Sequence, residues 1–200
     1  MAVRVAIIDS GVRVPHPHIH KIAGGIALTS PAGEDTDFSD CLGHGTAVAA
    51  AVLEKAPDAD VFAVKVFHRQ LATQVDLLVR AIDWSLDHGM NLINLSLGTA
   101  NEAHATVLRE AVERVVLSGA KLVAAHGWLP GNLPGAVPVD LDWACPRDEF
   151  RTEMLPDGRI LYRASGFARP IPGVDPERNL KGISFAVANV TGLLARDYCL

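Results

Sequence analysis

A short stretch near the N-terminus decides the fold: VRVAIIDSG, residues 3–11. The unbroken apolar run from Val5 to Ile8 is typical of a strand that is buried on both faces of a sheet. Because the run is too short for a signal-peptide core or a membrane span, we expect it to form the first core strand. Asp9 then follows the carboxyl end of that strand, which is where parallel sheets bind their ligands.

The rest of the chain alternates similar runs with helical patterns. In residues 73–88 the apolar positions recur at three- and four-residue steps, which lays one helix face against a core. Strands covered by helices predict an α/β fold, a three-layer sandwich around a mostly parallel central sheet. The expected strands are 3–9, 60–66, 92–96 and 121–125, and the expected helices are 45–53, 73–88, 103–118 and 185–196.

The C-terminal third follows a weaker pattern. An Asp-Gly turn at 157–158 predicts a hairpin between residues 150–155 and 159–163. The proline-rich stretch 168–176 predicts a loop.

Composition limits the functional classes. With 200 residues, 49% of them hydrophobic and 20% charged, the chain predicts a single domain over residues 1–200. A net charge of −5 without a Lys/Arg run argues against nucleic acid, and no apolar run is long enough for a membrane span. Three cysteines (Cys41, Cys145 and Cys199) suggest free thiols, and without a recognisable secretion signal we expect the cytoplasm. Cys41 is interpreted as a small buried thiol rather than as a nucleophile.

Three motifs carry the chemistry: DSG at 9–11, GHGT at 43–46 and GISFA at 182–186. A serine hydroxyl needs a base to take its proton, an imidazole can act as that base, and a buried carboxylate orients the imidazole. A helix that begins near the serine aims backbone N–H groups at a developing oxyanion. Each motif alone is common, but the three in this order predict a catalytic triad of Asp9, His44 and Ser184.

These motifs resemble those of the subtilisin family of serine peptidases, and the resemblance extends over nearly the whole chain. The segment INLSLG at 93–98 looks like the family's substrate-flanking strand. The resemblance implies an endopeptidase in which the Ser184 backbone amide donates to the oxyanion. It also implies that an extended peptide is bound by two walls, Ser96, Leu97 and Gly98 on one side and Ala124, Ala125, His126 and Gly127 on the other.

The chain departs from the family at one donor. Trp128 stands where the family has an oxyanion-binding asparagine, and losing such a donor costs about 10²–10³ in turnover. Ring N–H groups of Trp128 or His126 are candidate replacements, and Asn132 is a third candidate, although it matches a later turn. The departure leaves an alternative function open: a pseudopeptidase that binds a peptide or partner protein without cleaving it. An esterase or acyl transferase would use the same triad.

The resemblance also implies a substrate and a partner. Compact members suit limited processing of a precursor peptide, such as leader removal in natural-product maturation. Less chain follows Ser184 than the family supplies, so we expect a homodimer or partner protein to cover the serine helix. No cofactor or metal is expected, because the calcium loop appears deleted and PHPHIH at 15–20 is interpreted as a surface loop.

Overall fold

A single sheet runs through the part of the chain that the computed structural model describes, residues 2–28 and 33–198. Its strands are β1 (Arg4–Asp9), β2 (Gly24–Leu28), β3 (Glu34–Asp35), β4 (Asp60–Lys65), β5 (Leu92–Leu95), β6 (Lys121–Ala125), β7 (Val137–Leu141), β8 (Phe150–Met154) and β9 (Ile160–Ala164). Within the described residues their order is β3-β2-β4-β1-β5-β6-β7-β9-β8. All neighbours pair in parallel except the outermost pairs, β3 with β2 and β8 with β9.

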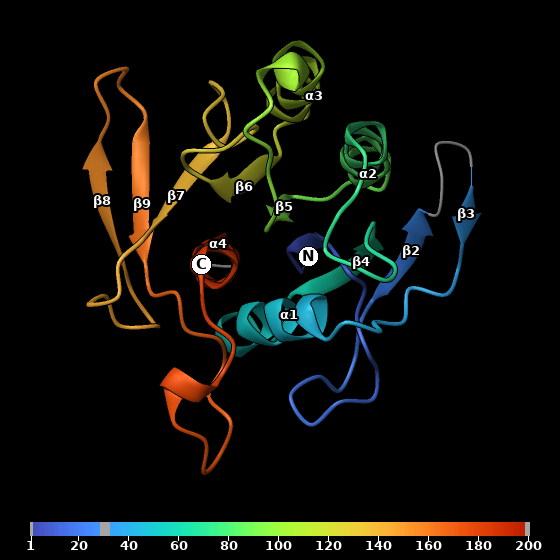
Figure 1. Ribbon diagram of the computed structural model, residues 1–200, viewed down its shortest axis with the longest axis vertical. Helices are drawn as coiled ribbons and strands as arrows, with labels where there is room; N and C mark the ends of the chain where they lie inside the picture. Colours follow the sequence, from blue (N-terminus) through green and yellow to red (C-terminus); the bar gives the residue numbers. More distant parts are fainter. Residues whose placement is uncertain (1, 29–32, 199–200) are drawn as a thin grey trace.

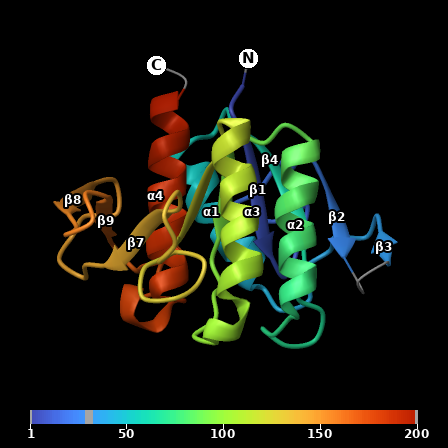
Figure 2. The ribbon, with the colours of Figure 1, turned by 90° about the horizontal axis from the view of Figure 1, so that it is seen from above.

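Helices cover both faces of this sheet, which gives the three layers that the sequence predicts. The helices are α1 (His44–Lys55), α2 (Val75–Asp87), α3 (Ala105–Ser118) and α4 (Ile183–Tyr198), with short 3₁₀ turns η1 (Glu102–His104) and η2 (Pro176–Arg178). α2 and α3 lie together on one face, and α1 packs against α4 on the other (Figures 1 and 2). The α/β class is therefore confirmed.

The central strand β1 shows why the sheet needs both helical layers. Val5 and Ile7 point into the core shared with α1, whereas Ala6 and Ile8 point into the core shared with α2 and α3. All four side chains are essentially inaccessible to solvent. Successive strand residues face opposite sides, so a strand with both kinds of position apolar is stable only between two covering layers.

The burial of α4 removes the reason for expecting a partner to cover it. From the sequence we expect a second molecule to cover the serine helix, but ten of its sixteen residues are buried within this chain. α1, β5, β6, β7 and β9 all contact α4. Gly192 allows the close approach, since a Cβ there would lie 2.9 Å from the carbonyl oxygen of Val52 on α1. The proposed reason for a covering partner therefore disappears.

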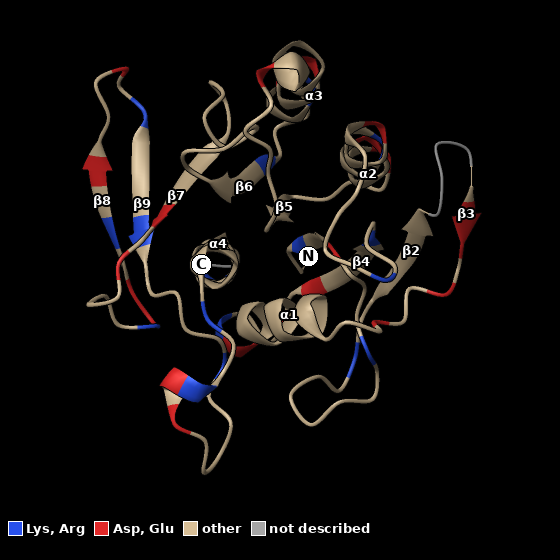
Figure 3. Cartoon of the chain, viewed as in Figure 1, with Lys and Arg blue, Asp and Glu red and all other residues tan. Residues whose placement is uncertain are grey.

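Two further expectations concern cysteines and charge. Cys145 is a buried free thiol, but Cys41 is exposed, which corrects its interpretation as a buried residue. Cys199 lies outside the described residues. Lys and Arg are interspersed with Asp and Glu over the elements (Figure 3). Over the described residues, no helix is long and apolar enough to cross a membrane.

Candidate active site

Asp9 ends β1, and its side chain is completely buried. An uncompensated carboxylate would be costly there, so its partners matter. Asp9 Oδ1 accepts hydrogen bonds from the Ser10 backbone N–H at 2.7 Å and from the ring of His44. The carboxylate is thus fixed at the carboxyl edge of the sheet, where the sequence places it.

His44 is the first residue of α1, and its ring faces this carboxylate. Nδ1 lies 2.8 Å from Asp9 Oδ1 and 3.0 Å from Asp9 Oδ2. When Nδ1 carries the proton, Nε2 is left as the basic nitrogen. Gly45 makes the geometry possible, because a Cβ at that position would lie 2.3 Å from the carbonyl oxygen of Gly11. The helix start is also tied to Ser10, whose Oγ accepts the Gly45 N–H at 2.9 Å.

Two opposing effects set the pKa of His44. Burial alone would lower it, because burial penalises the imidazolium. The hydrogen bond that His44 donates to Asp9, the charge of Asp9 and the charge of Asp40 act in the other direction and raise the pKa above its ordinary value of 6.5. A ring paired in this way suits a base that must hold a proton transiently.

Ser184 is the second residue of α4 and follows the positive-φ residue Gly182. Its Oγ donates to the backbone carbonyl of Ser96 at 3.1 Å, and the Ser96 hydroxyl donates back to the Ser184 carbonyl at 3.3 Å. The start of α4 is thereby fixed to the segment that follows β5.

One cavity of about 220 Å³ brings His44 and Ser184 together with most of the predicted substrate contacts. Its other lining residues are Phe67, Leu71, Ser96, Leu97, Gly98, Ala125, Trp128 and Ile183. The two walls are joined by backbone hydrogen bonds between Thr99 and Leu129, both at 2.9 Å. The cavity therefore lies between the segment after β5 and the segment after β6.

Three predicted substrate residues lie elsewhere. Ala124 is fully buried and packs in the core beneath α2 and α3. His126 donates its backbone N–H to Val139 at 2.7 Å, so it is tied to β7 instead of lining the cavity. Gly127 is exposed in a turn at φ +88° and also does not line it.

Residues 1–138 match the model of the subtilase family, Peptidase_S8. The chain belongs to the subtilase family. This match includes Asp9 and His44 but ends before Ser184, so the serine rests on its motif and on the structure.

Subtilases of known sequence match part of the chain. The minor extracellular protease Epr of Bacillus subtilis (strain 168) is 34% identical over 147 residues, which cover 67% of this chain and 22% of that protein. Subtilisin DY of Bacillus licheniformis is 34% identical over 134 residues, which cover 62% of this chain and 47% of that protein. The matched region thus spans less than half of either relative.

Solved structures match almost the whole subtilase chain. A cold-adapted subtilisin-like serine proteinase aligns over 96% of this chain and 74% of its own, with a TM-score of 0.72 and 22% identity. The prenylagaramide maturation protease PagA aligns over 97% of this chain and 74% of its own, with a TM-score of 0.72 and 26% identity. Both alignments extend through nearly all of the fold.

At Trp128, this subtilase differs from the family's pattern. The indole lines the cavity but is 48% exposed, so it forms part of the rim. Asn132 instead supports a turn, since its Oδ1 accepts the Gly127 N–H at 2.7 Å. Of the three side chains considered as replacement oxyanion donors, only Trp128 lines the cavity.

Sequence reasoning also missed the groups that support the serine. Asn94 Nδ2 donates to Ser96 Oγ at 2.8 Å, and Thr191 Oγ1 on α4 donates to Asn94 Oδ1 at 3.0 Å. Asn94 and Thr191 are fully buried in an otherwise apolar interface. A polar residue at the centre of the apolar run LINL, residues 92–95, was the available signal.

No group of three or more His, Cys, Asp or Glu side chains among the described residues is arranged to hold a metal ion. In the loop 15–20, the rings of His16 and His18 instead pack edge to face, with centroids 5.6 Å apart. The absence of a metal remains a prediction.

Proposed function

We propose that this subtilase hydrolyses peptide bonds with Ser184 as nucleophile, His44 as general base and acid, and Asp9 as the group that orients His44. The observation that carries the proposal is the hydrogen bond from His44 Nδ1 to the buried carboxylate of Asp9, within a cavity that His44 shares with Ser184. Homology to the subtilases supports this assignment.

The geometry supports a two-stage reaction. Ser184 Oγ attacks the scissile carbonyl while His44 Nε2 takes the hydroxyl proton, and the C–N bond breaks as His44 returns that proton to the leaving amine. A water molecule then attacks the ester with His44 again as base, which releases the acid and restores Ser184. The Ser184 N–H, at the positive end of α4, stabilises the oxyanion in both stages.

One local movement precedes attack. Ser184 Oγ donates to the Ser96 carbonyl, and no hydrogen bond joins it to His44, which is also within the described residues. Rotation about χ1 moves a serine hydroxyl between staggered positions without moving the backbone. Hydrogen bonds of catalytic groups are often incomplete before substrate binds, so this arrangement is compatible with catalysis.

The proposed substrate is an extended peptide that pairs its backbone with Ser96–Gly98, as main-chain recognition requires no particular side chain. The similarity to PagA, a maturation protease, supports limited processing of a precursor peptide, such as leader removal. We further propose that residues 1–200 form one domain that acts in the cytoplasm, where the free thiols Cys41 and Cys145 would stay reduced.

The test is labelling with a fluorophosphonate, read by intact mass at pH 8. Wild type is expected to gain one adduct, whereas Ser184→Ala gains none and His44→Ala reacts at least about 10³-fold more slowly. Circular dichroism checks that each variant is folded. An equal adduct on wild type and Ser184→Ala would place the reactive group elsewhere.

A second candidate function is a peptide-binding pseudopeptidase. The bond of Ser184 Oγ to Ser96 and the indole at the position of the family's amide favour it. A folded wild-type protein that forms no adduct, yet binds an extended peptide, would support this function. Cleavage of esters but not of peptides would instead indicate an esterase or acyl transferase.

A further inference from the structure

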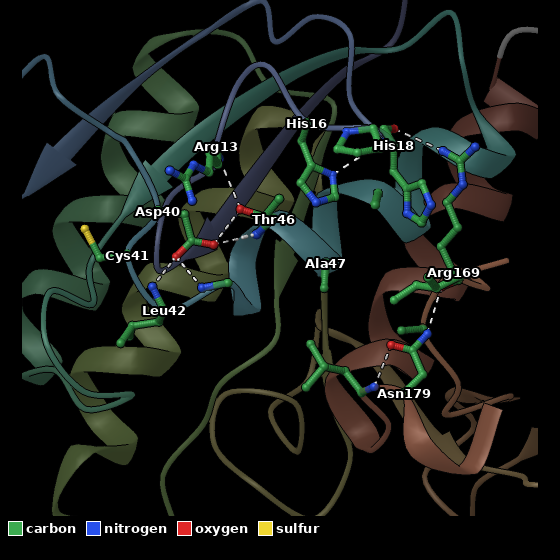
Figure 4. Close-up of a pocket in the computed structure, with 16 residues that line it drawn as sticks. Arg13, His16, His18, Asp40, Cys41, Leu42, Thr46, Ala47, Arg169 and Asn179 are labelled. Atoms are coloured by element: carbon green, nitrogen blue, oxygen red, sulfur yellow. Dashed lines mark hydrogen bonds between the residues drawn. The ribbon is translucent and has the colours of Figure 1, made fainter. Parts of the chain in front are cut away.

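A second cavity, of about 490 Å³, lies beside α1 and borders Gly43, the residue before His44, but it shares no lining residue with the cavity of His44 and Ser184. Three segments enclose it with α1: the loop 12–20, the turn 40–43 and the arm 166–182, which leads into α4 (Figure 4). Four basic side chains line it: Arg13, His16, His18 and Arg169. Nothing in the proposed reaction uses this cavity.

The two arginines of this basic cavity are not neutralised. Within the described residues, the Arg13 guanidinium has no ion pair or side-chain hydrogen bond. Arg169 Nη1 donates to the backbone carbonyl of His18 at 3.0 Å, which fixes the side chain, and no carboxylate of the described part of the chain pairs with its charge. Guanidinium groups held beside a cavity are suited to two-pronged hydrogen bonding with a carboxylate.

Asp40 is the one carboxylate among the residues that line this cavity, and it already accepts hydrogen bonds from the residues that follow it. It is 7% exposed and accepts hydrogen bonds from the Leu42 and Gly43 N–H groups at 2.8 and 2.9 Å. Its second oxygen accepts from the Thr46 N–H at 2.9 Å and from the Thr46 hydroxyl at 2.6 Å. With its oxygens occupied, Asp40 stabilises the turn before His44 and does not pair with Arg13.

The pKa of His18, which also lines the cavity, reflects the surrounding positive charges. Burial lowers the pKa of His18, and the positive charges of Arg169 and His16 lower it further, against a smaller opposing effect of Glu54. Bringing another cation here is therefore unfavourable, whereas an anion would be attracted.

The floor of the cavity is apolar, and its outer part is accessible. Leu42, Ile171 and Leu180 are 37%, 43% and 49% exposed, and Ala47 and Ala50 of α1 form the base. Such a combination fits a peptide segment in which an apolar side chain lies next to an acidic one.

The position of the cavity determines which part of a peptide reaches it. Gly43 directly precedes His44, and Leu180 lies four residues before Ser184. In peptide hydrolysis the general acid protonates the leaving amine, so the departing C-terminal segment lies on the side of His44. In the proposed binding mode the acyl segment pairs with Ser96–Gly98, which line the other cavity.

We propose that the basic cavity binds an acidic residue of the peptide substrate, C-terminal to the scissile bond, through Arg13 and Arg169. This proposal rests on the proposed peptidase function and adds a substrate preference to it. Asp and Glu side chains supply the carboxylate, and a neighbouring apolar side chain contacts Leu42 and Leu180.

The test is cleavage of a proteome-derived peptide library by wild type and by Arg13→Gln/Arg169→Gln, with the products sequenced by mass spectrometry. Among the peptides that wild type cleaves, Asp and Glu are expected to be enriched at a position C-terminal to the scissile bond. Synthetic peptides with Glu or Gln at the enriched position then give the ratio of kcat/KM values. Each arginine removed is expected to lower that ratio about fivefold, as a partly exposed charge pair would.

Two control variants separate charge from structure. Arg13→Lys/Arg169→Lys keeps both charges and should keep much of the acidic preference, and Arg109→Gln on α3 removes an exposed arginine outside this cavity. All variants should react with the fluorophosphonate at the wild-type rate.

The outcomes distinguish the two proposals. Cleavage with no preference for acidic residues would overturn the basic cavity as a substrate site, and so would a preference that the double Gln variant retains. Either result would leave the proposed peptidase function unaffected. No cleavage and no adduct on Ser184 would overturn both.

Discussion

Gly45 lies directly against Asp9: a Cβ at Gly45 would be 3.1 Å from the Asp9 Cβ and 3.2 Å from its Oδ1. The start of α1 thus touches the end of β1 through a backbone that carries no side chain. This contact holds His44 and Asp9 at hydrogen-bond distance, although one lies on a helix and the other on a strand.

Gly45→Ala is therefore expected to reduce the fluorophosphonate rate at least about tenfold, because a shift of α1 by a few tenths of an ångström to 1 Å misplaces His44. The measurement is the rate of adduct formation beside thermal unfolding. Ala51→Gly, in the same helix, is the matched control: it should lower stability by at least about 1 kcal/mol yet label at nearly the wild-type rate. Wild-type labelling in Gly45→Ala would contradict the proposed constraint.

The pH dependence of labelling should report the pairing of His44 with Asp9. The reaction needs neutral His44, so its rate is expected to rise with pH through a midpoint above 6.5, in line with the raised pKa. In Asp9→Asn burial, the largest influence on this pKa, is opposed only by the charge of Asp40, the smallest, so the midpoint should fall below 6.5 and the maximal rate should drop by about 10³–10⁴. An unchanged midpoint would show that Asp9 does not control the proton on His44.

The same raised pKa has a consequence for stability. Because the folded protein binds this proton more tightly than the unfolded chain, the pair stabilises the fold fully below pH 6.5. That contribution is lost as the pH rises through the raised pKa. Urea titrations of wild type and Asp9→Asn across this range should converge at high pH.

Replacing Trp128 by asparagine should restore an amide at the position where the family has one. Trp128→Asn is expected to raise the rate of peptide hydrolysis at least about tenfold, since one oxyanion donor is worth about 10²–10³ in related chemistry. Trp128→Phe removes the indole N–H but keeps an aromatic rim, and should stay within about threefold of wild type. A much larger loss in Trp128→Phe would show that the indole itself is the donor.

Glu54 of α1 and Arg147 form an ion pair across 93 residues of sequence, with contacts at 3.1 and 2.5 Å. Although burial opposes it, hydrogen bonds from Arg147 and Lys55 lower the pKa of Glu54 to about 2. The stabilisation is therefore present above pH 4.5 and is lost as the pH falls towards 2. Arg147→Gln should cost about 1–3 kcal/mol at pH 7 and less at pH 3, measured by urea unfolding.

Arg151→Gln provides the comparison for that experiment. Arg151 also pairs with a carboxylate, Asp142, but its side chain is 58% exposed. Its loss should change the free energy of unfolding by less than about 1 kcal/mol. Equal costs for the two variants would show that the Glu54–Arg147 pair gains nothing from its burial.

Much of the architecture follows from periodicity alone. The four predicted strands and four predicted helices all form, with boundaries that shift by a few residues at most. They were predictable because each buries one or both faces, and the spacing of the apolar residues on a buried face can be recognised within a short stretch of sequence. The hairpin of β8 and β9 was predictable from its Asp-Gly turn.

The strands that escaped prediction lack such a signal. β2 begins with two glycines, which favour a loop, yet a Cβ at Gly25 would lie 2.4 Å from the carbonyl oxygen of Ala63. Glycine is there because β4 approaches closely. β7 contains Pro138, which weakens any strand prediction, although the structure accommodates it beside β6.

The residues of the site likewise differ in whether a local pattern predicts them. Asp9, His44 and Ser184 could be predicted because their motifs are local, whereas the support of Ser184 by Asn94 and Thr191 is a long-range contact. The burial of Ala124 could not be foreseen either. Along β6 the side chains alternate between faces, and only the three-dimensional register shows which of them reaches the cavity.

The proposed catalytic groups are far apart in the sequence, Asp9 and His44 on β1 and α1 and Ser184 on α4. A ribosome therefore releases Asp9 and His44 long before it has joined Ser184 to the chain. α4 must also find its place against α1 and between β5 and β9 before Ser184 meets His44. Under the proposed mechanism, a nascent chain could not cut its neighbours before Ser184 has been added, so the order of translation itself would delay activity.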